Sequence, residues 1–241
     1  MNTSFSQKQV MTGVNNLPQI ASVLLVLEIV FFMTAFVVLG QAIDWPASLD
    51  EPASVVLPRL VAHQGSVVFG YYSYLLSAIL LVPLAIVLHC YFGLKQNPLL
   101  LSATAFGIIS GAMKSLGIIR WLFLMPYLAN RYVVSDNSPA LQETISLLYD
   151  TFNLYAGKVG EYIGVQMFTA LWVGLLSLAV LRSRQLPIWL SGFGIVVAIA
   201  WLLSLLGDSG ISLFESAVFI STTLLNFWYL TLAIVLVKGH R

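Results

Sequence analysis

Charged residues are scarce in this sequence, and their scarcity excludes most classes of soluble protein. Only 9% of the 241 residues are charged and 59% are apolar, whereas soluble domains carry about 25% charged residues. The formal net charge is +1, and basic residues cluster only at Arg182 and Arg184, which argues against a nucleic-acid partner. A mean hydropathy of +0.91 indicates an integral membrane protein whose partners are membrane lipids.

The cysteine and histidine residues are too few, or too far apart, to form a disulfide, a metal site or a haem site. The single cysteine, Cys90, excludes an internal disulfide and a cysteine-based metal site. His63 and His89 would lie about 39 Å apart on one helix, which argues against a bis-histidine haem. The motifs of zinc proteases, serine nucleophiles and phosphate-binding loops are missing, so we expect neither a metal nor a cofactor.

Six long apolar runs predict six transmembrane helices. The runs are 20–39, 66–94, 99–127, 159–181, 187–206 and 213–237. Each can cross about 30 Å of hydrocarbon as a helix, and lipid leaves backbone amides no other partner. Asn97-Pro98 and Leu186-Pro187 mark breaks before the third and fifth runs. We therefore predict an all-α bundle at 20–237, between an N-terminal segment (1–19) and a short tail (238–241).

The first run is expected to remain as a span. It is longer than the apolar core of a cleaved signal peptide, and Glu28 interrupts it.

The distribution of charge predicts how the helices are oriented. Cations without acids gather at one set of run ends, namely Lys8, Lys95, Arg182, Arg184, Lys238 and Arg241. The other connections hold Asp44, Asp50, Glu51, Asp136, Glu143, Asp150, Glu161, Asp208 and Glu215, with Arg59, Arg131 and Lys158. Because cytoplasmic loops carry an excess of Lys and Arg, both termini are predicted to be cytoplasmic and the acidic side external.

Two external connections are long enough to hold structure. In residues 40–65, Trp45-Pro46 and Glu51-Pro52 predict an irregular surface segment. The apolar residues that follow it are expected to lie in the membrane interface, namely Val55, Val56, Leu57 and Leu60. Residues 139–157 predict an amphipathic helix. Its apolar positions recur at helical spacing, at Leu141, Ile145, Leu148 and Phe152. This helix either rests on the outer surface or runs into the fourth span through Gly157 and Gly160.

Three charged residues lie deep inside the apolar runs, away from their ends: Glu28, Lys114 and Arg120. Each costs about 2.5 to 3.5 kcal/mol near a helix centre. Lys114 belongs to a helical stripe of small residues, Gly107, Ser110, Gly111 and Gly117, so it is expected to face another helix. Glu28 and Lys114 differ in depth by about 9 Å. We hypothesise that they form a buried or water-bridged pair, which either serves a site or merely orients two helices.

A second pair is predicted between Arg120 and Glu161. Glu161 shares a helix face with Gly157 and Gly164, which suits close packing. In the alternative interpretation, Arg120 and Trp121 anchor the third helix at the membrane interface.

Polar stripes on three helices predict a pocket that opens outward. They comprise Tyr71, Tyr74 and Ser77 on the second helix, Tyr162, Gln166 and Thr169 on the fourth, and Glu215, Thr222, Asn226 and Tyr229 on the sixth. The expected ligand-binding residues are Glu28, Tyr71, Tyr74, Lys114, Arg120, Glu161, Tyr162, Gln166 and Asn226. Alternatively, the tyrosines belong to an interfacial belt and Asn226 bonds a neighbouring helix.

The stretch from Gly164 to Gly192 carries a family resemblance. It contains Trp172, Gly174, Arg182-Ser183, Leu186-Pro187 and Trp189-Leu190, and it resembles the bacterial multi-pass family catalogued as domain of unknown function 4386. Leu84 to Leu88 and the following run to Arg120 are similar to the earlier half of that family. The resemblance covers residues 18–237 and implies a bacterial cytoplasmic membrane and a six-helix fold, without catalytic residues that could be carried over.

Three classes of function follow from these patterns. The favoured one is binding or sensing of a small amphipathic or lipid-like ligand in the outward-facing pocket. An intramembrane enzyme acting on a lipid or isoprenoid could use Glu28, Glu161 or Asp150 as acid or base, with Lys114 or Arg120 holding an anionic head group. A small transporter is the third class, although the glycine pattern of the first three helices does not recur in the last three.

Overall fold

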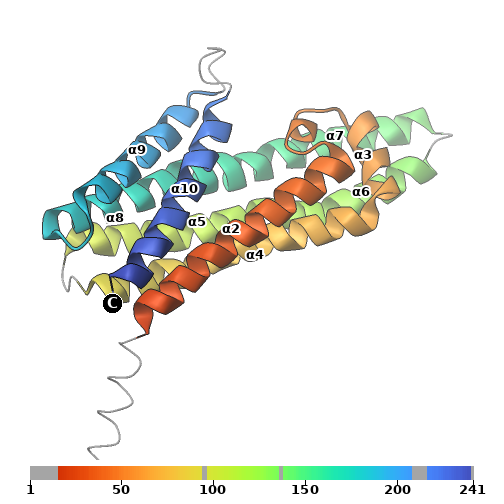
Figure 1. The fold of residues 1–241 in the computed structure, drawn as a ribbon. Helices are drawn as coiled ribbons and strands as arrows, with labels where there is room; N and C mark the ends of the chain where they lie inside the picture. Colours follow the sequence, from red (N-terminus) through yellow and green to blue (C-terminus); the bar gives the residue numbers. More distant parts are fainter. Residues whose placement is uncertain (1–15, 94–96, 136–137, 208–215, 240–241) are drawn as a thin grey trace, which may run out of the picture. The chain divides into compact units, whose positions relative to one another are not determined.

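The computed structural model describes residues 16–93, 97–135, 138–207 and 216–239, and every regular element there is a helix (Figure 1). The elements are α2 (Leu17–Ile43), η1 (Ala47–Leu49), α3 (Ala53–Ala62), α4 (Gln64–Phe92), α5 (Pro98–Leu122), α6 (Leu124–Val134), α7 (Pro139–Gly157), η2 (Lys158–Phe168), α8 (Thr169–Ser183), α9 (Ile188–Ser204) and α10 (Ala217–Lys238). Of these, η1 is a 3-10 helix and η2 a π-helix. The predicted all-α class is confirmed for this part of the chain. Outside the described residues lie most of the N-terminal segment, the end of the tail, and the charged residues Lys8, Lys95, Asp136, Asp208, Glu215 and Arg241.

Five helical runs in the described ranges are long and apolar enough to cross a membrane, so the chain is a multi-pass membrane protein. They are Leu17–Ile43, Gln64–Phe92, Pro98–Val134, Pro139–Ser183 and Ala217–Lys238. The fifth predicted span corresponds to α9. Its 17 residues extend about 26 Å at 1.5 Å per residue, less than the ~30 Å of hydrocarbon. Six spans and cytoplasmic termini therefore stay predictions.

Helix ends coincide with the breaks expected from the sequence. At the start of α5, the Asn97 side chain accepts hydrogen bonds from the amides of Leu99 (3.0 Å) and Leu100 (3.4 Å), as an N-cap does. Pro98 then occupies the first helical position, where its missing amide proton costs nothing. At the other end of a span, α2 stops before Asp44, whose φ of 61° lies in the left-handed region.

The chain folds as two compact units. The first comprises Met1–Ile29, Leu80–Ser110 and Gln166–Arg241, and the second Val30–Ile79 and Gly111–Val165, so the boundaries fall within α2, α4, α5 and η2. In the first unit α9 contacts α8 and α10. Its core holds the buried rings of Trp172 and Trp228, whose centroids lie 6.4 Å apart edge to face. The indole nitrogen of Trp228 donates to the carbonyl of Leu190 at 3.3 Å.

In the second unit, α3 packs against α6 and α7. Val56, Leu57 and Leu60 are buried in its core. The expectation that these side chains lie in the membrane interface was wrong, because they are buried in the protein. The three residues fall on one face of a helix, and the exposed Ser54 lies away from it. These apolar side chains are therefore buried against neighbouring helices and not in lipid.

The predicted helix near 139–157 is present as α7. It continues through η2 into α8 without a break, so it runs into the fourth span, and the alternative of a separate surface helix was wrong. Ile145 and Tyr149 form its buried face, whereas Leu141, Leu148 and Phe152 are exposed. Of the four apolar positions predicted for this helix, only Ile145 therefore packs against the protein.

Candidate functional site

A small cavity in the second unit is the candidate site. It is lined by Trp45, Leu49, Tyr71, Tyr74, Lys114, Gly117, Ile118, Arg120, Trp121, Gly160, Glu161 and Val165. These residues come from the connection after α2 and from α4, α5 and η2. The cavity volume is about 20 Å³. A water molecule needs about 10 to 15 Å³ on the same measure, so the space admits one small polar group.

Close contact between α5 and η2 builds one side of this cavity. A methyl group added to Gly117 would lie 2.6 Å from the Cα atom of Gly160. One added to Gly164 would lie 2.8 Å from the backbone nitrogen of Lys114. Because glycine has no side chain, the backbones of α5 and η2 can touch here, as they do where small residues line a contact between membrane helices. The predicted close approach near Lys114 is thus confirmed, and η2 is the partner helix.

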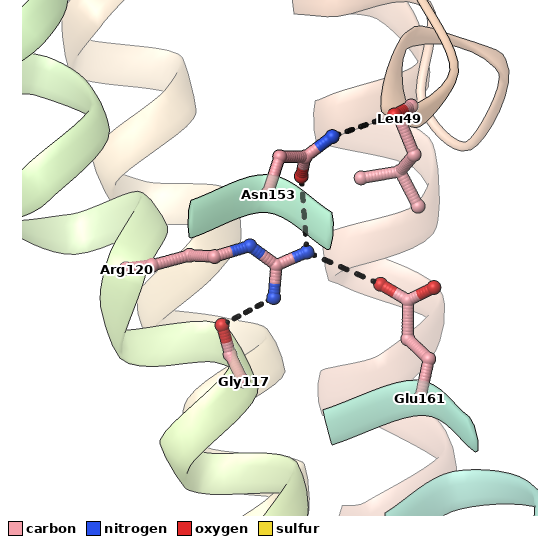
Figure 2. Close-up of polar contacts among 5 residues, drawn as sticks. All are labelled: Leu49, Gly117, Arg120, Asn153 and Glu161. Carbon is pink, nitrogen blue, oxygen red and sulfur yellow. Dashed lines mark hydrogen bonds and ion pairs between the residues drawn. The ribbon is translucent and has the colours of Figure 1, made fainter. Parts of the chain in front are cut away.

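Arg120 is the centre of the polar contacts, as Figure 2 shows. Its Nη1 donates to the carbonyl of Gly117 at 2.7 Å, and its Nη2 donates to Asn153 Oδ1 at 3.3 Å and to Glu161 Oε1 at 3.4 Å. The guanidinium also lies 5.5 Å from the ring centroid of Trp121. The predicted contact between Arg120 and Glu161 is therefore present.

The alternative role of an interface anchor was wrong. The side chain of Arg120 is only 5% exposed, and the ring of Trp121 is buried. A snorkelling arginine would extend its guanidinium to water. Here the protein supplies a carbonyl, an amide oxygen and a carboxylate instead.

Further hydrogen bonds tie α7 to the connection that covers the site. Asn153 accepts from Arg120, and its Nδ2 donates to the carbonyl of Leu49 at 2.8 Å (Figure 2). The hydroxyl of Tyr149 donates to the carbonyl of Glu51 at 3.5 Å. Glu51 in turn pairs with Arg59 at 2.7 Å. The position of the connection thus depends on polar side chains of α3 and α7.

Aromatic rings form the walls around these charges. Tyr71 stacks on Trp121 with centroids 5.1 Å apart and planes only 7° from parallel. Trp45 meets Tyr74 edge to face at 5.6 Å. Rings arranged in this way keep water away and lower the local dielectric, which strengthens every polar contact inside.

Two buried polar atoms of cavity-lining residues have no hydrogen-bond partner within the described residues. They are the Tyr71 hydroxyl and the Nε of Arg120. The Tyr71 residue is 1% exposed. An unsatisfied buried donor costs about 1 to 3 kcal/mol. Both groups donate protons, so a small group with acceptor atoms is the chemical complement of this cavity.

Five of the nine residues predicted to bind a ligand line this one cavity: Tyr71, Tyr74, Lys114, Arg120 and Glu161. Lys114 is 8% exposed, as expected for a lysine that faces protein. Tyr162 lies on η2 with its ring 5.8 Å from the Nζ of Lys158, and it is not a lining residue.

The other three predicted residues, Glu28, Gln166 and Asn226, belong to the first unit. Glu28 is buried there, and its pairing with Lys114 stays a prediction. The Nδ2 of Asn226 donates to the carbonyl of Thr222 on its own helix at 2.8 Å.

Several residues of the candidate site were not predicted from the sequence. Asn153 is the most important, and a signal for it existed, because Ile145, Tyr149 and Asn153 are four residues apart and share one helix face. Trp45 and Leu49 gave no such signal, since the path of an irregular connection sets their position. The described residues hold no group of three or more His, Cys, Asp or Glu side chains placed to bind a metal ion.

The chain matches a known protein family. The family model described as "Domain of unknown function (DUF4386)" matches residues 20–239. That range includes every residue that lines the cavity, and it agrees with the resemblance seen between Gly164 and Gly192. No curated protein and no solved structure matches the chain.

Proposed function

The chain belongs to the family of domain of unknown function 4386, and on that premise we propose that it is a membrane protein that binds a small amphipathic or lipid-like molecule. The polar end of the ligand enters the cavity beside Lys114 and Arg120. One observation carries the proposal: two buried cations line the same cavity as Glu161, whose side chain is 45% exposed.

The cost of these charges supports a role in binding. Ionisable residues within membrane spans are expensive, and they commonly mark ligand, ion or proton sites. Lys114 and Arg120 belong to one helical run, Pro98–Val134, that is apolar enough to cross a membrane. Their burial beside aromatic walls concentrates charge in a small, water-poor space.

The size of the cavity restricts what part of the ligand enters it. About 20 Å³ is too little for an entire amphipathic molecule, since sites for drug-sized ligands occupy about 300 to 1,000 Å³. A hydrocarbon chain would therefore remain in the bilayer while the polar group occupies the cavity. The partly exposed Glu161 marks the side from which this group reaches Arg120.

Photochemical labelling tests the proposal. The protein is reconstituted in phosphatidylcholine nanodiscs and irradiated with dodecanoate and, separately, dodecanol, each carrying a diazirine near its polar end. At least one probe is expected to label residues 114–121 or 160–165 saturably, and excess unlabelled probe should suppress this labelling. Labelling that does not saturate and is spread over exposed apolar residues outside these segments, such as Phe219, would contradict the proposal.

A pair of variants makes this test specific to the cavity. Val165→Phe adds volume at a lining position and is expected to abolish the saturable labelling. Leu116→Phe adds the same kind of volume at an exposed position and should leave labelling unchanged. Thermal unfolding of both variants verifies that they are folded. Equal labelling of the two would show that the cavity is not the binding site.

A further inference from the structure

We propose that the polar end of the ligand is an anionic oxygen acid, a carboxylate or a phosphate, and that Glu161 is the internal counter-ion that this group displaces from Arg120. The inference rests on the proposed function, and it adds the chemical class of the ligand and the side chain that makes way for it.

The hydrogen bonds of Arg120 show which side of the guanidinium is held and which is available. Its Nη1 makes a short bond of 2.7 Å to the carbonyl of Gly117, which fixes the group in place. Its Nη2 makes two longer contacts, to Asn153 at 3.3 Å and to Glu161 at 3.4 Å. Charge-assisted bonds of this kind ordinarily measure about 2.7 to 2.9 Å. The bond to Glu161 is thus the longest of these three hydrogen bonds of Arg120.

The available side of Arg120 has the geometry that recognises an oxygen acid. In a guanidinium, the Nε proton and one Nη2 proton point in the same direction and bind two oxygens of one carboxylate or phosphate. Nε has no partner among the described residues, and Nη2 bonds only one oxygen of Glu161. Of this pair of donors, Nε and Nη2, which we call the fork, the carboxylate of Glu161 therefore binds only Nη2.

Tyr71 supplies a further donor for the same group. It lines the same cavity, and its buried hydroxyl has no partner in the described part of the chain. Its ring is held against Trp121, the residue next to Arg120. A carboxylate or phosphate offers enough lone pairs for Tyr71 and the fork together. A cationic head group offers none and is repelled by Arg120, and an alcohol lacks the second oxygen that the fork requires.

The exposure of Glu161 allows its carboxylate to move away from Arg120. Its side chain is 45% exposed, whereas that of Arg120 is 5% exposed, so Glu161 reaches the surroundings while the guanidinium stays bound to Gly117 and Asn153. A ligand carboxylate has the same shape as the carboxylate it replaces. The exchange also keeps one negative charge beside Arg120, which avoids leaving a buried cation unpaired.

Competition experiments with the photoreactive dodecanoate test this assignment. The competitors are dodecanoate, dodecyl phosphate, dodecanol and dodecyltrimethylammonium, added to the protein in phosphatidylcholine nanodiscs. The two acids are expected to suppress labelling at concentrations at least about tenfold lower than dodecanol, because charge-assisted bonds are roughly twice as strong as neutral ones. Dodecyltrimethylammonium should not compete.

Variants test the roles of the individual side chains. Glu161→Gln removes the competing charge and is expected to tighten dodecanoate binding by about tenfold, because a buried arginine then lacks a counter-ion. Glu143→Gln, an exposed acid on α7, is the matched control and should change nothing. Arg120→Lys removes the fork and should weaken binding by at least about tenfold. Tyr71→Phe, which retains the stacked ring, tests the hydroxyl and remains informative if Arg120→Lys does not fold.

The possible results separate this inference from the proposed function. If photoreactive dodecanol labels the cavity and dodecanol competes as well as dodecanoate, a ligand binds but the anionic assignment is wrong. Unchanged or weaker dodecanoate binding in Glu161→Gln would overturn the counter-ion role. If inorganic phosphate or acetate competes as well as the dodecyl acids, the site takes a free anion and the amphipathic ligand is excluded. Failure of every amphiphile and of both free anions overturns both proposals.

Discussion

At the scale of single residues, two glycines decide how closely α5 and η2 approach. Gly117 and Gly160 are in backbone contact, and a methyl group on either would lie 2.6 Å from the other. Only backbone atoms meet there, so a flexible side chain cannot move aside to accommodate the added atom. The contact also sets the distance between Arg120 on α5 and Glu161 on η2.

We predict that Gly117→Ala destabilises the protein by about 1 to 3 kcal/mol, as overpacking does. The measurement is the thermal unfolding midpoint in detergent, followed by tryptophan fluorescence. Gly192→Ala is the control, because a methyl group there would meet no atom within 4 Å. In a helix it should be neutral or stabilising by up to about 1 kcal/mol. Equal shifts for the two variants would show that the contact with Gly160 is unimportant.

The residue scale also shows where sequence reasoning succeeds. The pairing of Arg120 with Glu161 could be predicted, because a charge in an apolar run must face protein and nearby glycines mark the approach of a helix. The position of Tyr162 could not, because the predicted stripe of Tyr162, Gln166 and Thr169 requires an α-helix with 3.6 residues per turn. Residues 158–168 instead wind as a π-helix, with bonds from i to i+5. Accordingly, the lining residues Gly160 and Val165 are five positions apart.

At the scale of elements, α7 holds the connection between α2 and α3. Asn153 bonds both the guanidinium of Arg120 and the carbonyl of Leu49. One amide side chain therefore joins the charged site to the segment that carries Trp45, a wall of the cavity. The sequence predicted α7 itself but not this role, because the carbonyl that Asn153 contacts belongs to a single 3-10 turn in the connection, whose path has no periodic signal.

Asn153→Ala is expected to lower stability by about 1 to 3 kcal/mol, since it removes two part-buried hydrogen bonds, one to the guanidinium of Arg120 and one to the carbonyl of Leu49. The local consequence is measurable by hydrogen exchange, which should become faster over residues 44–52. Asn130→Ala is the matched control, because the Asn130 amide is exposed and bonds only its own helix, at the carbonyl of Pro126 (2.8 Å). If exchange in the connection is the same in both variants, Asn153 does not hold it.

At the scale of the whole molecule, hydropathy predicts helices well because lipid permits few alternatives. The backbone must satisfy its own hydrogen bonds there. Accordingly, the run 20–39 lies within α2, and α4 contains residues 66–92 of the second run. Hydropathy does not predict whether α9 crosses the membrane. With 17 residues, it is at the lower end of the range of about 17 to 25 residues for a span.

Cysteine labelling in intact bacterial cells tests the orientation and the number of spans. In a Cys90→Ser background, Ser54→Cys and Ser216→Cys are expected to react with a membrane-impermeant maleimide. Arg184→Cys should react only after permeabilisation, because the excess of Lys and Arg on its side of the membrane predicts that this side is cytoplasmic. All three positions are exposed. If Ser216→Cys behaves like Arg184→Cys, α9 does not cross. If Ser54→Cys is protected, the orientation is reversed.

Leu147, Leu154 and Tyr155 project from α7 and are 67%, 65% and 71% exposed. Side chains of this size and polarity need an apolar environment, and in a purified sample only the detergent annulus can provide it. Detergents with short alkyl tails form a thin annulus that would leave these side chains in water. Protein molecules would then associate through α7. Long-tailed detergents or nanodiscs are therefore the conditions under which this protein should remain monodisperse.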